Sequence, residues 1–378
     1  MNELVLPRYG RASVADVLPS IAAHLGVAAA GVPALDLPSA NRYVVVLVDG
    51  LGHQLLQRAL ALAPWCADRI GGSAVLTATV PSTTATSLTS LGTGRPPGQH
   101  GVVGYAFRDR VAGEVFNALT WNTAAVPEQV QCCPTWFEQL GAAGHQVTAV
   151  VPQRFDGSGL TRAALRGQVL SAMVDESDEQ DRITRTVAAS RQGSHSLVYV
   201  YERMLDHTGH ALGVAHDAWG QQLSRIDAFL GRLREALDDD VVMLVTGDHG
   251  MVDVPTERRI ILEEHPELLQ GLAALAGEGR FRQLYTDDPA GLAERWAGLL
   301  GERAWVRRRD EALAQGWFGD DPDPAITGRI GDLVVAMRQD WALMSTTLPG
   351  ELGLVGMHGS LTAAEMLVPL LVEAGGQG

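Results

Sequence analysis

An aspartate and a histidine stand side by side in Asp248-His249-Gly250, directly after a strongly apolar segment of the chain. That segment, 241–245, reads Val-Val-Met-Leu-Val and predicts a buried parallel strand that ends at a turn. Ligands of open α/β sheets bind at the carboxyl ends of strands, so both side chains are expected at a binding edge. Alone, such a pair is more often a loop hydrogen bond than a metal site, so its meaning depends on the rest of the chain.

Other acids and histidines occupy comparable places, after apolar segments or beside glycine. The full set is Asp49, Asp206, His210, Asp248, His249 and His358. Asp206 and His210 are four residues apart, so one helical turn would place both on the same face. Three carboxylates and three imidazoles are the ligand composition of a dinuclear site for a borderline metal. We therefore predict two Zn²⁺ ions, with Mn²⁺ as the alternative.

Seven hydroxyl residues lie between Ser82 and Ser90, around a helical turn predicted at 88–91. Serine and threonine commonly cap helices and form turns, which is the structural interpretation of this stretch. Two metal ions about 4 Å apart clamp the oxygens of a phosphate ester and lower the pKa of a hydroxyl nucleophile. Because a threonine hydroxyl is inert at neutral pH without activation, this stretch is a candidate source of the nucleophile.

Apolar and helical segments alternate along the chain and would position these residues. The strand candidates are 43–48, 74–80, 147–151, 198–201, 241–245 and 366–372. The helix candidates are 13–25, 54–63, 136–141 and 216–237. This alternation is typical of a doubly wound α/β fold. Between 252 and 345, short strand candidates and one helix near 290–300 predict a smaller αβ cap region inserted into a single domain of 378 residues.

The formal net charge is −15, from 29 basic and 44 acidic residues. This balance argues against a nucleic-acid polymer as partner, whereas a small phosphorylated substrate is compatible with it if metal ions reverse the local charge. The three cysteines, Cys66 and the pair Cys132-Cys133, argue against a disulfide framework. Without an apolar signal core or a run of about 18 apolar residues, we predict a cytoplasmic protein with no membrane span. The oligomeric state is not predicted.

The motifs, in their order and rough spacing, resemble the alkaline phosphatase superfamily, and most closely its nucleotide pyrophosphatase/phosphodiesterase branch. They are Val48-Asp49-Gly50, Pro81-Ser82-Thr83-Thr84, Asp206-x-x-x-His210, Asp248-His249-Gly250-Met251 and His358-Gly359. The resemblance covers about residues 43 to 372 and implies an alkaline-phosphatase-like α/β/α sandwich with a mostly parallel central sheet. It also implies the division of the ligands: Asp206, His210 and His358 for one zinc ion, and Asp49, Asp248 and His249 for the other.

The same resemblance implies that Thr84, three residues after the motif proline, is the nucleophile and forms a phosphothreonine intermediate that water hydrolyses. Ser82 and Thr83 are the alternatives if the register differs. The branch usually has an aromatic residue directly after the nucleophile and an asparagine two residues further on, where this chain has Ala85 and Ser87. These departures put nucleotide stacking in doubt.

We predict that Ser87 contacts the substrate phosphate in partial replacement of that asparagine. Tyr201 is the predicted aromatic wall of the substrate site, and Tyr105 is a second candidate. The predicted function is a metal-dependent phosphohydrolase, in the first place a phosphodiesterase or nucleotide pyrophosphatase.

A phosphomonoesterase or phosphonate hydrolase on the same scaffold is the alternative, with Arg154 and Arg203 as candidate binders of a second negative charge. In a different class, the alternative is a non-catalytic member that only binds.

Overall fold

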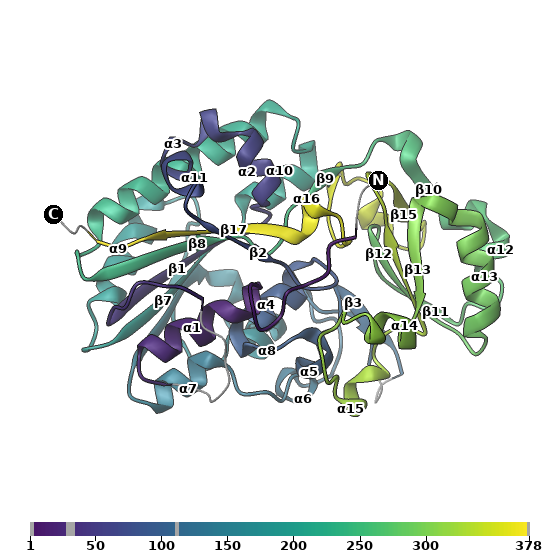
Figure 1. Cartoon of the computed structure of the whole chain (residues 1–378), viewed down its shortest axis with the longest axis horizontal. Coiled ribbons are helices and arrows are strands. Elements are labelled where there is room, and N and C mark those ends of the chain that lie inside the picture. The colour runs from purple at the N-terminus through teal and green to yellow at the C-terminus, as the bar shows by residue number, and fades with distance from the viewer. Residues whose placement is uncertain (1–3, 28–34, 110–112, 376–378) are drawn as a thin grey trace.

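A seven-stranded sheet forms the centre of the computed structural model, which describes residues 4–27, 35–109 and 113–375 (Figure 1). The strand order is β2-β17-β8-β1-β7-β5-β6. Strands β8, β1, β7, β5 and β6 run parallel, and β17 is antiparallel to both β8 and β2. The bounds are β1 Arg42–Val48, β2 Ala74–Thr77, β5 Gln146–Pro152, β6 Val169–Met173, β7 Ser196–Glu202, β8 Val241–Thr246 and β17 Leu367–Glu373. The predicted α/β class with a mostly parallel sheet is confirmed.

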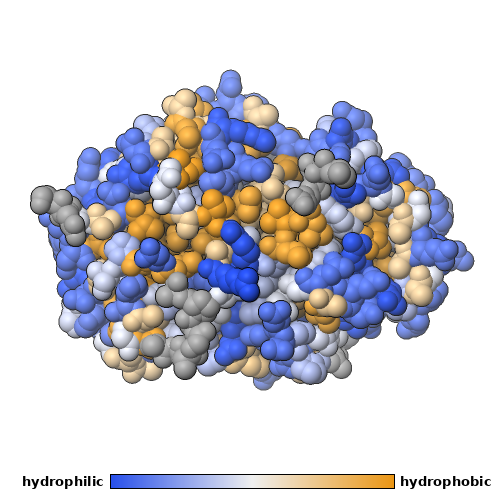
Figure 2. Space-filling model, in the orientation of Figure 1, coloured by the Kyte–Doolittle hydropathy of each residue, from blue (hydrophilic) through white to orange (hydrophobic). Residues whose placement is uncertain are grey.

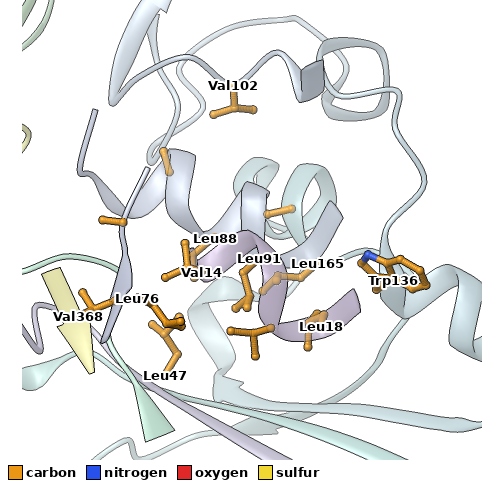
Figure 3. Packing of buried hydrophobic residues seen from close by; sticks show 14 of the residues in the cluster. Val14, Leu18, Leu47, Leu76, Leu88, Leu91, Val102, Trp136, Leu165 and Val368 are labelled. Carbon is orange, nitrogen blue, oxygen red and sulfur yellow. The ribbon is translucent and has the colours of Figure 1, made fainter. Parts of the chain in front are cut away.

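Helices cover both faces of this sheet, because successive side chains of a strand point to opposite faces. In β1, Tyr43, Val45 and Leu47 belong to one apolar cluster, and Val44, Val46 and Val48 to the other. Figure 3 shows part of the first cluster, in which Leu47 and Leu76 of the sheet lie near Leu88 and Leu91. The described α-helices outside residues 252–345 are α1 Val17–His24, α2 His53–Arg58, α3 Pro64–Ile70, α4 Thr84–Thr93, α5 Pro97–His100, α6 Pro127–Val130, α7 Trp136–Ala142, α8 Gly159–Ala164, α9 Glu179–Ser190, α10 Met204–Leu212, α11 Asp217–Ala236 and α16 Ala363–Met366.

Helix α4 begins at Thr84, four residues earlier than the helical turn predicted at 88–91. All ten of its residues are buried. Its polar side chains remain satisfied because Thr89 and Thr93 donate to the backbone carbonyls of Ala85 and Thr89, one turn earlier. The sequence prediction underestimated this helix because hydroxyl residues favour turns and caps in isolation. The strand predicted at 74–80 is also shorter, since pairing ends at Thr77.

Residues 252–345, which we call the insert, build a second and smaller sheet at one end of the molecule (right in Figure 1). Its order is β11-β12-β14-β13, all antiparallel, and a parallel pair β10-β15 accompanies it. The strands are β9 Val252–Asp253, β10 Arg259–Ile261, β11 Ala274–Glu278, β12 Phe281–Tyr285, β13 Ala304–Arg308, β14 Leu333–Met337 and β15 Ala342–Met344. The helices are α12 Pro266–Leu269, α13 Pro289–Leu300, α14 Arg309–Ala314 and α15 Pro324–Thr327.

Several contacts attach the insert to the rest of the chain. Strand β9 pairs with β16 Gly356–Met357, and the hairpin β3 Ala106–Arg108 with β4 Val115–Asn117 packs near β11. Arg280 and Glu365 form an ion pair at 2.6 Å with both side chains fully buried. Glu365 also accepts from Ser360 N, and its backbone carbonyl accepts from Gly250 N. One acidic residue therefore joins the insert to the loops that follow His249 and His358.

The surface of the face seen in Figure 2 groups apolar side chains along its middle, with hydrophilic ones around them. None of the helices in the described part of the chain combines the length and apolar character needed to cross a lipid bilayer. The predicted cytoplasmic location stays a prediction.

Candidate active site

The six acids and histidines singled out in the sequence meet at one edge of the central sheet. Asp49 follows β1, Asp248 and His249 follow β8, and Asp206 and His210 lie in α10, directly after β7. Because β8, β1 and β7 are neighbours and parallel, their carboxyl ends lie together. His358 reaches the same edge from the loop after β16.

Asp206, His210 and His358 form the first group of side chains with metal-ligand spacing. His210 Nε2 lies 3.4 Å from Asp206 Oδ2 and 3.2 Å from His358 Nε2. His358 Nε2 lies 3.9 Å from Asp206 Oδ1. The two imidazoles therefore aim their Nε2 atoms at the same small volume as one carboxylate.

Asp49, Asp248 and His249 gather beside the first group. His249 Nε2 lies 3.4 Å from Asp49 Oδ1 and 3.5 Å from Asp248 Oδ2. Asp49 and His249 combine with Asp206 in the second group with metal-ligand spacing. The His249 and His358 rings stack with centroids 3.6 Å apart, which places the two groups side by side.

The donor atoms of both groups fit divalent metal ions. The Nδ1 atoms of His210, His249 and His358 lie 2.8 to 3.0 Å from the carbonyl oxygens of Gly356, Gly250 and Ser82. A carbonyl only accepts, so each Nδ1 carries the proton and each Nε2 presents its lone pair. Asp49 Oδ1, Asp206 Oδ1 and Asp248 Oδ2 are buried without a hydrogen-bond partner. Buried carboxylate oxygens of this kind are costly unless a cation pairs with them.

The electrostatics of the cluster lead to the same conclusion. Burial, together with the nearby charges of Asp248 and Asp206, raises the pKa of Asp49 well above its usual range. Burial also raises the pKa of Asp248 and lowers that of His358 well below its usual range. Clustered acids favour protonation in the absence of cations, and a bound dication reverses that preference.

Among the three candidate nucleophiles, Thr84 is the one whose hydroxyl contacts the cluster. Its Oγ1 lies 3.2 Å from His249 Nε2, and it is the first residue of α4. Thr83 Oγ1 instead donates to Glu278 Oε2 at 3.4 Å, and Ser82 Oγ donates to the carbonyl of Ser360. The position of Thr84 at the start of a helix adds backbone N–H groups that favour an anion.

Three residues predicted to contact the substrate do not line the cavity that opens over Thr84. Ser87 is fully buried, and its Oγ donates at 2.8 Å to the backbone carbonyl of Asp248, so it supports the loop that carries Asp248 and does not line the cavity. Arg154 and Arg203 both form ion pairs with Glu176. Glu176 lies on a loop that does not line the cavity, and neither of the two arginines paired with it lines the cavity.

A cavity of about 730 Å³ opens over Thr84 and the candidate metal-ligand residues Asp49, Asp206, His210 and His358. The hairpin residues Tyr105 and Phe116, the aromatic pair Phe155 and Tyr201, and Glu278 of the insert contribute to its wall. Glu278 was missed from the sequence, where its only signal is the pair of flanking glycines. Burial raises the pKa of the Glu278 carboxyl well above its usual range.

Tyr201 lines the cavity, and its hydroxyl donates to Asp49 Oδ2. We expect Tyr201→Phe to lower zinc affinity about tenfold or more, because a partner that orients a metal-binding carboxylate contributes that much. Competition with a zinc-binding dye would measure the change. Phe155→Leu, which alters the same wall but no hydrogen bond to Asp49, is the control; an equal loss of affinity in both variants would contradict the orienting role.

Comparison with known families gives an independent line of evidence. Residues 43–361 match the family model described as type I phosphodiesterase / nucleotide pyrophosphatase. Among curated proteins, GPI ethanolamine phosphate transferase 3 of Eremothecium gossypii is 38% identical over 47 residues, which is 12% of this chain and 5% of that protein. The catalytic subunit from Mus musculus is 36% identical over 59 residues, 16% of this chain and 5% of that protein. These alignments thus span only a small part of the curated relatives.

Solved structures share the fold over most of the chain. Murine ectonucleotide pyrophosphatase/phosphodiesterase 5 superimposes with a TM-score of 0.71 at 17% identity, covering 87% of both chains. An inactive threonine-to-alanine variant of that protein, in complex with AMP, has a TM-score of 0.69 at 18% identity, with the same coverage. Phosphonoacetate hydrolase from Sinorhizobium meliloti 1021, in complex with phosphonoformate, gives 0.67 at 20% identity, covering 89% of this chain and 91% of the other.

Proposed function

Because the chain belongs to the type I phosphodiesterase / nucleotide pyrophosphatase family, whose members hydrolyse phosphoric ester bonds, we propose that it is a dizinc phosphodiesterase with Thr84 as its nucleophile. The observation that carries the proposal is the position of Thr84 Oγ1, 3.2 Å from His249 Nε2 within a cluster of three aspartates and three histidines. The inactive threonine variant of ectonucleotide pyrophosphatase/phosphodiesterase 5 supports a threonine in this role.

Asp206, His210 and His358 would hold one zinc ion, and Asp49, Asp248 and His249 the other. When bound, the ions would lower the pKa of the Thr84 hydroxyl and neutralise charge on the phosphoryl oxygens. Thr84 Oγ1 releases its proton to solvent and forms a bond to phosphorus while the bond from phosphorus to the leaving oxygen breaks. The leaving oxygen keeps the electron pair of that bond, takes a proton from water and departs as an alcohol. The first-turn N–H groups of α4 orient the transferred phosphoryl group. A water molecule then attacks phosphorus and releases Thr84.

Charge balance favours a diester as the substrate. Three aspartates and two dications leave one positive charge, which matches the single negative charge of a phosphodiester. A phosphomonoester or phosphonate dianion carries a second charge, and the arginines predicted to bind it are paired with Glu176 away from the cavity. We also propose that the insert acts as a cap, since Leu275 and Glu278 contribute to the cavity wall.

The direct test measures zinc content and substrate preference of the protein purified without chelators. We expect about two zinc ions per chain and a kcat/KM for bis-p-nitrophenyl phosphate at least about tenfold above that for p-nitrophenyl phosphate, the ratio expected for one unmatched charge at an active site. A preference for the monoester or for phosphonoacetate would favour the phosphatase or phosphonate hydrolase alternative. Less than one metal ion per chain and no turnover would favour a non-catalytic binding protein.

The relatives do not identify the second ester group of the substrate, because their names describe groups of opposite charge. One structural neighbour was solved with AMP and another with phosphonoformate, both anionic, whereas the curated relatives are named for the transfer of ethanolamine phosphate, which carries an amine. Which class this chain accepts depends on the residues of its own cavity.

A further inference from the structure

The cavity wall beyond the metal-ligand residues is aromatic, aliphatic and acidic. The chain contains no lysine, so all 29 of its basic residues are arginines. None of the arginines in the described part of the chain lines the cavity. Tyr105, Phe116, Phe155 and Tyr201 present aromatic rings to it, and Glu278 and Glu351 present carboxyl groups. Aromatic rings together with carboxylates attract cations, and neither attracts an anion.

Of the two carboxyl groups, Glu278 retains an unused acceptor. Glu351 forms an ion pair with Arg282 and accepts from Ser345 N, so its charge is compensated. Glu278 Oε2 accepts only a long bond, at 3.4 Å, from Thr83, and its Oε1 is buried without a partner. The Glu278 side chain is 16% exposed, at the margin of the cavity that contains Thr84.

The neighbouring backbone leaves space for this side chain. Gly359 has φ +127°, and a Cβ atom there would lie 2.9 Å from Glu278 Oε1 and 3.0 Å from its Cδ. Any other residue at position 359 would displace the carboxyl group, so the glycine after His358 permits Glu278 to reach the site from the insert. Glu278 Oε2 lies 4.0 Å from His358 Nδ1, so the carboxyl group lies beside a residue of the aspartate and histidine cluster.

We infer that Glu278 selects substrates by charge: it favours phosphodiesters whose second ester group carries an ammonium, and it disfavours those with a further anionic group. The inference rests on the proposed function and specifies its substrate class. An ammonium would donate to the free Oε1 and stabilise the ionised carboxyl group, which burial otherwise disfavours, whereas an anionic group would meet this carboxyl group in a cavity that no described arginine lines. A charge-assisted hydrogen bond of this kind changes affinity by about tenfold to a hundredfold.

Three p-nitrophenyl phosphodiesters of nearly equal size test the inference, with 2-aminoethyl, propyl or carboxymethyl as the second ester group. For the wild-type enzyme we expect kcat/KM to fall in that order, with at least about a tenfold ratio of aminoethyl to propyl, expressed mainly in KM. In Glu278→Gln this ratio should approach one, and Glu278→Asp should retain part of it. Glu263→Gln, which removes an insert carboxylate that hydrogen-bonds Ser345 and Thr346 away from the cavity, should keep the wild-type ratio.

An aminoethyl-to-propyl ratio that is unchanged in Glu278→Gln, or a preference for the carboxymethyl ester, would overturn the inference. If the wild-type enzyme hydrolyses none of the three diesters, the proposed function fails, and binding then decides the inference separately. Calorimetry would compare methyl 2-aminoethyl phosphate with methyl propyl phosphate on the zinc-loaded Thr84→Ala protein. Tighter binding of the aminoethyl ester that Glu278→Gln abolishes supports the inference, and equal binding of the two esters refutes it.

Discussion

Replacing Thr84 with alanine is expected to lower kcat for bis-p-nitrophenyl phosphate on the order of 10⁶-fold, as the loss of the attacking serine does in a serine protease. The reason is that Thr84 Oγ1 is the candidate hydroxyl in contact with the cluster, 3.2 Å from His249 Nε2. Zinc content should stay at its wild-type value, because Thr84 belongs to neither ligand group. Steady-state kinetics with metal analysis of the same samples measures both.

Two neighbouring threonines provide matched controls for Thr84→Ala. Thr83→Ala tests the alternative register, and its effect should be far smaller because the Thr83 hydroxyl donates to Glu278. Thr86→Ala removes a buried hydroxyl that bonds the carbonyl of Pro81, and should cost stability more than turnover. Acid quenching of the wild-type reaction followed by peptide mass spectrometry should find the phosphate on Thr84. A Thr84→Ala enzyme within tenfold of wild type would sink the nucleophile assignment.

The part of the site predicted best from the sequence lies at the ends of the central strands. Asp49 and Asp248 each follow a continuous apolar segment, and such segments become neighbouring parallel strands whose carboxyl ends coincide. The strands themselves determine that these acids meet. His358 is different, because it follows a two-residue strand that pairs with β9. Its local signal in the sequence was the neighbouring Gly359, and the resemblance to a family supported its place in the set.

Three of the predicted substrate contacts have partners that the sequence does not indicate, because these partners depend on how separate segments pack. Ser87 is one turn after Thr84, yet the rotation of α4 presents Leu88 to the cavity and turns Ser87 toward the Asp248 backbone. Arg154 and Arg203 are held by Glu176, which no sequence pattern connects to them. Such pairings depend on tertiary contacts, which the local amino-acid sequence does not predict.

Glu278 shows the same limit most clearly. It is the last residue of β11 in the insert and is far along the chain from most of the motifs. It lies at the site because the insert packs against the rest of the chain, where the buried Arg280–Glu365 pair joins the two parts. Short strands with few β-branched residues predicted the existence of the insert but not its docking. The residues common to a family can therefore be predicted from the ends of the strands. The residues that distinguish this chain depend on how the insert packs against the rest of the molecule, which the sequence did not predict.

Replacing Asp248 with asparagine should reduce bound zinc from about two ions per chain to about one and lower kcat at least about 10³-fold, since one member of a two-metal site would be lost. The change is conservative in shape. Asp248 Oδ1 accepts from Gly50 N and His249 N, and the asparagine oxygen preserves both bonds. Only Oδ2, which is buried without a partner and 3.5 Å from His249 Nε2, becomes an NH₂ group that cannot bind a cation.

Stability of the metal-free proteins separates a ligand role from a structural one. Burial raises the pKa of Asp49, and the nearby charge of Asp248 raises it further, because the two carboxylates repel each other when no cation is present. Removing that charge should leave metal-free Asp248→Asn at least as stable as the metal-free wild type in thermal unfolding, while zinc stabilises it less. Asp227→Asn is the control, because both Asp227 oxygens accept backbone N–H bonds, from Trp65 and Cys66, away from the cluster. It should lose stability with and without zinc and keep its metal content, and an Asp248→Asn protein that behaves the same way would contradict the two-metal assignment.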